Sequence, residues 1–423
     1  MRVLVLSQYF WPETFRITEV TQSLRDLGHE VSVLTGQPNY PDGVVPPGYS
    51  AASLCTEYFD GFVIHRVPLF PRKRGSALHL FLNYLSFIVF AIAFGPVLLR
   101  GRRYDAILVY ANSPILQAIP AIWLAWIKGA KLVTWVQDLW PESLRATGFV
   151  RNQKILDTVA ALIRWIYRKN DLLLVQSQAF VEPVQAMAGK TPVVYHPNPG
   201  ELAFTEIGSI GPVALQLEAG FNVVFAGNLG TVQALDTVLA AAQLLRSEKN
   251  IRFVLVGSGS RSAWLQQEIQ RLGLENVKIP GRFPPSDMPG ILSQASALLV
   301  SLVSDTVISQ TVPSKVQAYL AAGRPIIASL DGEGARVVVE AGAGIACPAE
   351  NANALAAAVI RLRDAPPEML EQMSRNGHRY YEENFNPERL ASKLTYLLFN
   401  LIQGKQLAKS GDSNLNENHK YDG

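Results

Sequence analysis

Short apolar runs alternate with stretches of helical spacing along the first half of the chain. The run 2–7 (RVLVLS) ends in polar residues, and so does the run 30–35 (EVSVLT), which follows a stretch of helical spacing at 18–29. Short apolar runs bounded by turn residues predict buried strands, and apolar residues spaced three and four apart predict helices. Four more strands are predicted in this half, at 62–68, 105–111, 130–138 and 171–177.

The second half repeats this alternation. Its strand-like runs cover 221–227, 251–257, 276–281, 297–303, 324–330 and 344–348. Strands that alternate with helices predict a parallel sheet with right-handed crossovers, so the predicted fold class is α/β. We expect two Rossmann-like domains whose parallel sheets face a central crevice, because ligands of such sheets bind beyond the carboxyl ends of the strands.

The domain boundaries follow from the places where this periodicity weakens. A length of 423 residues suits two or three domains of about 150 residues each. We predict an N-terminal domain at 1–200 and a second domain at 201–386. A last helix at 387–402 is expected to pack back on the first domain. The polar tail at 403–423 is expected to be disordered.

The segment 78–99 (LHLFLNYLSFIVFAIAFGPVLL) is long and apolar enough to span a bilayer. A span would place strands of one sheet on opposite sides of the membrane, and Gly95 and Pro96 suggest a break in the helix. The alternatives are a buried core helix and a helix that dips into the membrane face, and we favour the last. A second interfacial patch is predicted at 162–169. Basic residues flank the segment on both sides, namely Arg72, Lys73, Arg74, Arg100, Arg102 and Arg103.

Composition excludes several classes of protein. Hydrophobic residues make up 48% of the chain and charged residues 17%, and the mean hydropathy is +0.13, so a disordered chain is excluded. The net charge of 38 − 35 = +3 is too small for nucleic-acid binding across a whole surface, and we predict no nucleic-acid partner. Two cysteines, Cys55 and Cys347, cannot form a four-thiolate site, and they fit a reducing cytoplasm.

The motifs of several nucleotide and metal enzymes are missing. The turn after the first strand contains no glycine, and GSGSRS at 257–262 lacks the third glycine of a dinucleotide fingerprint. The chain has no P-loop, no HExxH and no DxD pair, and its six histidines lack ligand spacing. We therefore predict no cofactor and no metal site, and we disfavour a nicotinamide enzyme.

The second half contains residues suited to a diphosphate. Gly227, Gly230 and Gly257 follow predicted strands, where small residues let backbone N–H groups approach an anion. Ser314 and Lys315 open a predicted helix with a hydroxyl, an ammonium and free N–H groups. Plain strand–helix turns and a solvated lysine are the alternatives.

Two more candidates in this half are an acidic and a basic residue. Glu333, flanked by glycines in a predicted loop, could accept hydrogen bonds from sugar hydroxyls, or it belongs to a surface turn. Arg282 follows another strand end and is either a phosphate contact or a surface arginine.

Polar residues also follow strands in the first half. Gln137 and Asp138 end one strand, and Glu142 lies four residues beyond Asp138. Such paired carboxylates could do acid–base work, or they could cap the next helix. Glu13 and Trp11 belong to a polar and aromatic loop that could hold a sugar, or to an aromatic core cluster.

The chain resembles bacterial glycosyltransferases of family 4, which have the two-domain GT-B fold. The resemblance covers about residues 1–400 and is strongest to the subgroup of N-acetyl-L-fucosaminyltransferase-like enzymes of O-antigen and capsule pathways. The strings that carry it are SQYFWPE (7–13), LTGQPNYPDG (34–43), WVQDLWPES (135–143), AGNLG (226–230), TVPSKVQAYLAAGRPI (311–326) and LDGEGARVV (330–338).

This resemblance implies a nucleotide-diphosphate sugar donor, UDP-linked, in the C-terminal domain and a lipid-linked or glycan acceptor in the N-terminal domain. It also implies transfer with retention, no metal, and a cytoplasmic location at the face of the inner membrane. The catalytic residues we expect are Asp138, Lys315 and Glu333. The substrate-binding residues we expect are Glu13, Gln137, Glu142, Gly227, Asn228, Gly230, Gln233, Gly257, Arg282, Ser314 and Gly334.

The chain departs from the family pattern at several positions. Asn228 and Gln233 stand where the family has an arginine and a lysine, and Gln137 stands where it has a histidine. Gln310 and Ala318 stand where it has two glutamates. These departures favour a second hypothesis, a non-catalytic scaffold of a polysaccharide assembly. A nucleotide-sugar epimerase is a third hypothesis, disfavoured because a soluble substrate needs no membrane face.

Overall fold

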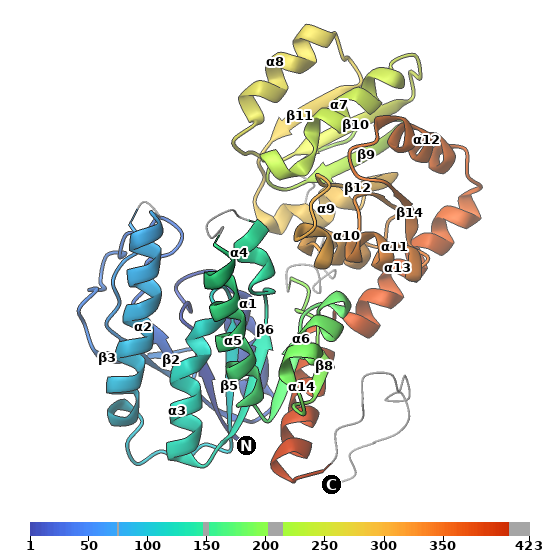
Figure 1. Ribbon diagram of the computed structural model, residues 1–423. Helices are drawn as coiled ribbons and strands as arrows, with labels where there is room; N and C mark the ends of the chain where they lie inside the picture. The colour runs from blue at the N-terminus through green and yellow to red at the C-terminus, as the bar shows by residue number, and fades with distance from the viewer. Residues whose placement is uncertain (74–75, 147–151, 202–214, 406–423) are drawn as a thin grey trace. The chain divides into compact units, whose positions relative to one another are not determined.

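The computed structural model describes residues 1–73, 76–146, 152–201 and 215–405. Its contacts divide the chain into two compact units (Figure 1). Met1–Asn198 together with Leu390–Gly423 form the N-domain, and Pro199–Arg389 form the C-domain. Arg74, residues 202–214 and the predicted tail from residue 406 onward lie outside the described residues.

The N-domain is built on an eight-stranded sheet of order β3-β4-β2-β1-β5-β6-β7-β8. Its central strands are continuous apolar runs because helices cover both faces of the sheet. All strand pairs are parallel except the edge pair of β3 with β4, which is antiparallel. The strands are β1 (Arg2–Leu6), β2 (Glu30–Gly36), β3 (Cys55–Phe59), β4 (Phe62–Val67), β5 (Ala106–Ala111), β6 (Lys131–Val136), β7 (Leu172–Val175) and β8 (Val193–Tyr195).

Alternate side chains of these strands point into two separate cores. Leu4 and Ile107 belong to the core under α2, α3, α5 and α6, whereas Val5 and Leu108 belong to the core under α1 and α14. The helical segments are α1 (Arg16–Asp26), α2 (Ala77–Leu98), η1 (Ile115–Gln117), α3 (Ala118–Lys128), α4 (Glu142–Ala146), α5 (Gln153–Arg168), η2 (Gln178–Phe180), α6 (Val181–Ala188) and α14 (Pro387–Ile402).

The C-domain has a six-stranded parallel sheet of order β11-β10-β9-β12-β13-β14. The predicted α/β class, with two parallel-sheet domains, is confirmed. The strands are β9 (Phe221–Ala226), β10 (Ile251–Val256), β11 (Val277–Gly281), β12 (Ala297–Ser301), β13 (Ile326–Ser329) and β14 (Gly344–Cys347). The helical segments are η4 (Thr231–Gln233), α7 (Leu235–Leu244), α8 (Ser262–Leu272), η5 (Pro285–Asp287), α9 (Met288–Leu292), η6 (Ile308–Gln310), α10 (Ser314–Ala322), α11 (Glu333–Glu340), α12 (Ala352–Arg363) and α13 (Pro367–Asn384).

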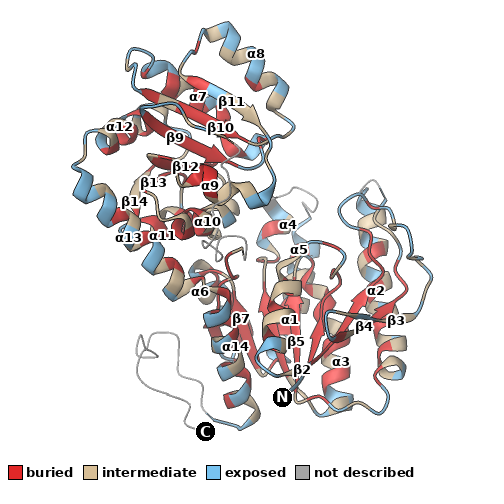
Figure 2. Cartoon of the chain, turned by 180° about the vertical axis from the view of Figure 1, so that it is seen from behind, coloured by how far each residue is buried: buried red, intermediate tan, exposed pale blue. Residues whose placement is uncertain are grey.

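Helix α2 is the apolar segment identified in the sequence. It buries one narrow stripe, Asn83, Phe87, Ala91 and Gly95, and leaves most of its remaining surface partly or fully exposed (Figure 2). Among the described helices it is the one long and apolar enough to cross a membrane, by length and composition, and 17% of its most apolar window is buried. The reading as a buried core helix is therefore wrong.

The strands before and after α2, such as β1 and β5, pair in one sheet, which agrees with the argument made above against a span. The helix continues through Pro96, so the suggested break is wrong.

Candidate active site

Two glycine-rich loops of the C-domain lie against each other beyond the carboxyl ends of β9 and β10. Gly227 and Gly257 have φ angles of +135° and +141°, a region that side chains rarely adopt. A Cβ atom on Gly257 would lie 1.9 Å from the carbonyl oxygen of Gly227, so the approach requires glycine. The Leu229 N–H donates to the carbonyl of Ser258 at 2.9 Å and fixes the two loops together.

Lys315 lies beneath the first of these loops. A Cβ atom on Gly227 would lie 2.6 Å from Cε of Lys315. The ammonium donates a hydrogen bond to Oε1 of Gln233 and lies 4.1 Å from the ring centroid of Phe225. The structure thus brings together three residues predicted separately from the sequence, Gly227, Gln233 and Lys315.

The charge of Lys315 is not balanced within the site. None of the ion pairs found in the described residues includes this lysine. Burial lowers the pKa of the Lys315 ammonium to about 7, because the charged form is poorly solvated there. A partly buried cation without a carboxylate partner is suited to bind an anionic group from a ligand.

The helix expected to start at the Gly227–Gly230 loop starts later. Residues 231–233 form the short segment η4, Ala234 has a φ angle of +46°, and α7 begins only at Leu235. A left-handed residue, Ala234, therefore separates this loop and η4 from α7. Asn228 is exposed, and its side-chain amide lies over Gly230.

The starts of α10 and α11 pack against each other. Ser314 is the exposed first residue of α10. Pro313, the residue before Ser314, lies close to Gly334 of α11. A Cβ added to Gly334 would be 2.9 Å from Cδ of Pro313. A Cβ on Gly332 would lie 2.0 Å from the carbonyl oxygen of Ser309, the middle residue of η6. These contacts hold the loop that follows β13 against the N-terminus of α10.

Glu333 occupies a helix and not the loop expected from the sequence. It is the first residue of α11, and it is 8% exposed. Its carboxylate accepts hydrogen bonds from Nε of Arg336 at 2.9 Å and from the second guanidinium nitrogen, Nη2, at 3.0 Å. Any sugar hydroxyl bound by Glu333 would have to share the carboxylate with Arg336, a pairing that sequence analysis missed.

Arg282 follows β11 and is exposed. Gly281, the residue before Arg282, accepts a hydrogen bond at its carbonyl from the Gly257 N–H at 2.8 Å. This bond places Arg282 one residue from the second glycine-rich loop. The predicted Arg282, Gly257, Gly227 and Lys315 are thus linked through successive loops of one sheet edge.

In the N-domain, Glu13 organises two loops. Its carboxylate accepts hydrogen bonds from the N–H groups of Asn39 at 2.7 Å, Tyr40 at 2.6 Å and Phe10 at 3.3 Å. Burial nevertheless raises the pKa of Glu13 to about 7, since desolvation outweighs the effect of these donors. This carboxylate is committed to the protein's own backbone, so its contact with a sugar remains a prediction.

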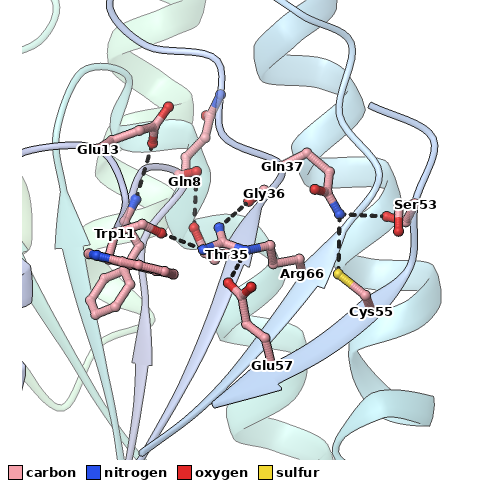
Figure 3. A network of polar contacts seen from close by, with 11 residues as sticks. Gln8, Trp11, Glu13, Thr35, Gly36, Gln37, Ser53, Cys55, Glu57 and Arg66 are labelled. Carbon is pink, nitrogen blue, oxygen red and sulfur yellow. Dashed lines mark hydrogen bonds and ion pairs between the residues drawn. The ribbon is translucent and has the colours of Figure 1, made fainter. Parts of the chain in front are cut away.

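A buried arginine beside this loop was missed by sequence analysis. Arg66 of β4 is completely buried and donates to Glu57 at 2.5 Å, to the carbonyl of Gly36 at 3.1 Å and to the carbonyl of Trp11 (Figure 3). The signal that could have identified it is an arginine within the apolar run FVIHRVP. The network fixes the loop that carries Trp11 and Glu13.

Asp138 and Glu142 lie on either side of the turn between β6 and α4. Asp138 accepts hydrogen bonds from the hydroxyl of Ser143 and from Nε1 of Trp140 at 3.2 Å, so it anchors the start of α4. Glu142 is the exposed first residue of that helix. Acid–base work by this pair of carboxylates stays a prediction.

The side-chain amide of Gln137 has one hydrogen-bonded atom and one atom without a hydrogen-bond partner in the described residues. Its Oε1 accepts a hydrogen bond from Nδ2 of Asn198 at 2.7 Å, and its carbonyl accepts one from Gln176. Its Nε2 is buried and has no partner in the described part of the chain. An orphaned buried donor at the end of β6 is suited to a hydroxyl or carbonyl of a ligand.

Comparisons with known proteins identify families and relatives of the chain. Residues 14–199 match the family described as "Glycosyl transferase 4-like domain", and residues 220–365 match the family described as "Glycosyl transferases group 1". The chain is 28% identical over 338 residues to the putative colanic acid biosynthesis glycosyl transferase WcaI of Escherichia coli K12, across 76% of this chain and 82% of the relative. It is 26% identical over 320 residues to the probable glycosyltransferase WbjE of Pseudomonas aeruginosa, across 71% of this chain and 76% of the relative.

Solved structures support the fold. Sucrose-phosphate synthase from Thermosynechococcus elongatus matches with a TM-score of 0.67 and 18% identity, over 96% of this chain and all of that chain (100%). Anabaena HepE in complex with UDP matches with a TM-score of 0.63 and 14% identity, over 94% of this chain and 100% of the other. At these identities the likeness shows the fold.

Proposed function

Because the chain is a glycosyltransferase with the GT-B fold, we propose that it moves a sugar from a nucleoside diphosphate sugar, UDP-linked, to a lipid-linked or glycan acceptor. The process we assign is cell-surface polysaccharide synthesis, since WcaI is named for colanic acid biosynthesis. The observation that carries the proposal is Lys315, a partly buried cation without a carboxylate partner beneath a glycine-rich loop. UDP-linked N-acetyl-L-fucosamine is the first sugar donor to test.

The proposed mechanism gives Lys315 the main electrostatic role. As the sugar leaves, the diphosphate gains negative charge, and a preorganised ammonium stabilises that charge more than the ground state. Gln233 holds the ammonium in place through its Oε1. Arg282, beside the second glycine-rich loop, supplies further positive charge. The positive charge of these side chains supports transfer without a metal ion, and retention at the anomeric carbon is proposed from the family resemblance.

The remaining candidate residues receive roles in orientation. We assign donor-sugar contacts to Glu333 and Gly334 at the start of α11, and diphosphate contacts to Ser314, Asn228, Gly230 and Gly257. We assign acceptor contacts to Glu13, Gln137, Asp138 and Glu142 of the N-domain. Gln137 has the strongest support among these, because its buried Nε2 has no partner in the described residues.

The first prediction concerns donor binding and its pH dependence. Calorimetric titration with UDP-, GDP- and ADP-sugars should find one that binds without added metal. Its affinity should be constant below about pH 6 and should fall above about pH 7, because the free Lys315 ammonium loses its proton there. The decrease should be at most about tenfold per pH unit, the limit for one linked proton.

The control for this titration is Lys315→Met, which should bind weakly and without the decrease above neutral pH. A nucleotide sugar carries no titrating phosphate in this range, so the profile reports the protein. Binding of the nucleotide sugar by Lys315→Met as tight as that of the wild-type chain would exclude Lys315 as the diphosphate cation. Absence of binding by every nucleotide sugar would favour the non-catalytic scaffold.

We also propose that the chain associates peripherally with the cytoplasmic face of the inner membrane. An apolar face spans α2, α3 and α5 of the N-domain, and its aromatic residues are typical of a bilayer interface. A groove of about 700 Å³ opens on it, lined in part by Trp123, Trp126 and Trp165. Its large exposed side chains are Leu78, Phe81, Leu85, Val89, Val97, Trp123, Trp126, Ile127, Ile155 and Trp165.

The second prediction tests this face. Replacing Trp123 and Trp126 together by serine should weaken binding to phosphatidylglycerol vesicles by about tenfold or more, because two exposed indoles leave the bilayer interface. Vesicle sedimentation measures the binding. Tyr58→Ser is the matched control, since Tyr58 is 79% exposed on edge strand β3. Equal binding by the double variant and the control would contradict the membrane assignment.

A further inference from the structure

Arg72, at the approach to α2, is held between two aromatic rings. Its guanidinium carbon lies 5.7 Å from the ring centroid of Tyr9 and 5.1 Å from that of Tyr40. Both distances fall within the range of cation–π contacts, about 6 Å. The backbone is fixed as well, because the Arg72 N–H donates to Oδ1 of Asn39 at 3.1 Å and the Lys73 N–H donates to the carbonyl of Gly43 at 3.0 Å.

The positive charge of Arg72 has no carboxylate to balance it. None of the ion pairs found in residues 1–73, 76–146, 152–201 and 215–405 includes Arg72. Glu13, which lies in the same group of side chains around Tyr9, directs both of its oxygens to main-chain N–H groups. Aromatic rings contact a guanidinium through their faces, which leaves its N–H donors available to an anion.

This cation is rigidly connected to α2. The ring of Tyr9 stacks on Phe15 at 5.4 Å, and its hydroxyl donates to Oδ1 of Asn83 at 3.1 Å. Asn83 is fully buried on α2 and donates from Nδ2 to the carbonyl of Phe70 at 2.7 Å. Through these hydrogen bonds of Asn83, the first turns of α2 fix Tyr9, one of the two rings that hold Arg72.

Helix α2 also presents an exposed apolar face. Leu78, Phe81 and Leu85 lie on the exposed side of α2 and are 65%, 60% and 41% exposed. Their spacing of three and four residues places them on one face of the helix. Lys73 adds a second exposed cation at the same end, with its ammonium 5.6 Å from the ring centroid of Phe70. Two cations, Arg72 and Lys73, therefore precede a helix that has an exposed apolar face.

We propose that Arg72 binds the phosphate or diphosphate of an acceptor carried on a hydrocarbon chain, and that the chain lies along Leu78, Phe81 and Leu85 of α2. The inference rests on the proposed transferase function and names its acceptor class, an amphipathic phosphate ester. Arg72 and the aromatic pair act as a binding subsite and take no part in bond making. The same chemistry is offered by bulk phospholipid headgroups and by free diphosphate, so the test must separate these sources.

The test measures binding of farnesyl diphosphate to the full chain by calorimetry, beside inorganic diphosphate and farnesol. Farnesyl diphosphate should bind about tenfold more tightly than either, because only it fills both parts of the site. Arg72→Met should weaken its binding by about tenfold or more, and Arg72→Lys by less. Arg100→Met, an exposed arginine beyond the other end of α2, should leave it unchanged.

Two further variants separate the parts of the site. Phe81→Ser combined with Leu85→Ser should weaken farnesyl diphosphate and leave inorganic diphosphate unchanged. Tyr40→Leu, at a side chain that is 42% exposed, should weaken both anions without a loss of folding, because it removes one of the two rings that orient Arg72. Farnesyl diphosphate binding that is unchanged in both Arg72→Met and Tyr40→Leu would overturn the proposal.

The sources of phosphate are separated by comparing two ligands of the same variant. Phosphatidylglycerol bicelles should bind Arg72→Met as tightly as they bind the wild-type chain, because the membrane face lies on α2, α3 and α5. If Arg72→Met abolishes bicelle binding, Arg72 is a headgroup contact and the acceptor assignment is overturned. Nucleotide-sugar titration of the same samples distinguishes the two proposals. Donor binding without farnesyl diphosphate binding overturns this inference alone, and the reverse result overturns the proposed function alone.

Discussion

Replacing Lys315 by methionine should lower the rate of sugar transfer by about 100-fold or more at saturating donor. The ammonium lies beneath Gly227 and has no carboxylate partner in the described chain, so its loss removes positive charge where the diphosphate charge develops. The C-domain should be as stable as wild type or more stable, since the buried charge no longer has to be desolvated. Transfer kinetics and thermal unfolding, analysed for each transition, measure both effects.

Two controls sharpen this experiment. Lys278→Met removes an exposed lysine from β11 of the same sheet and should keep the wild-type rate. Lys315→Arg should not restore activity, because the guanidinium is wider and Gly227 lies directly over the side chain. A Lys315→Met protein that binds donor and transfers sugar at the normal rate would rule out the assigned role.

The second large effect is expected in the N-domain. Arg66→Met should lower its free energy of unfolding by about 3 kcal/mol, because a completely buried guanidinium satisfies Glu57 and the carbonyls of Gly36 and Trp11. Methionine fills much of the volume but donates no hydrogen bond, so those oxygens are left without their donors. Urea denaturation followed by tryptophan fluorescence measures the change.

Arg2→Met is the comparison for this variant. Arg2 pairs with Asp105 at 3.6 Å, and the two side chains are 44% and 32% exposed. An exposed pair of this kind contributes about 0–1 kcal/mol, so its loss should be small. If the two variants lowered stability equally, the buried network around Arg66 would not be the source of the effect.

Much of the fold could be predicted from the sequence because the central strands are buried on both faces. Such strands are continuous apolar runs, as in β1 and β5, and they stand out without knowledge of their partners. The two missed strands lack this property. Strand β3 (CTEYF) lies at a sheet edge with residues that alternate between partial and full exposure, and β8 has only three residues.

In the candidate site, too, some residues could be predicted from the local sequence pattern, whereas contacts between side chains could not. The Gly227 loop and Lys315 lie at strand and helix ends, positions that a chain pattern reveals. The contacts that correct the other expectations are specific to side-chain geometry. Arg66 contacts the carbonyl of Trp11 across a separation of 55 residues, and Glu333 turns toward Arg336 of its own helix instead of toward a loop. No periodicity or motif reports such contacts.

Helix α14 has a consequence for how the protein is made. Leu394, Leu397 and Leu398 of this helix are buried in the same core as β1 and α1, although the whole C-domain lies between them in the sequence. The first domain to leave the ribosome therefore cannot complete its core until the last helix has been synthesised. Until then the apolar surface that α14 covers is open to solvent, which makes the growing chain a substrate for chaperones. A chain terminated just before Leu390 would leave this surface uncovered permanently.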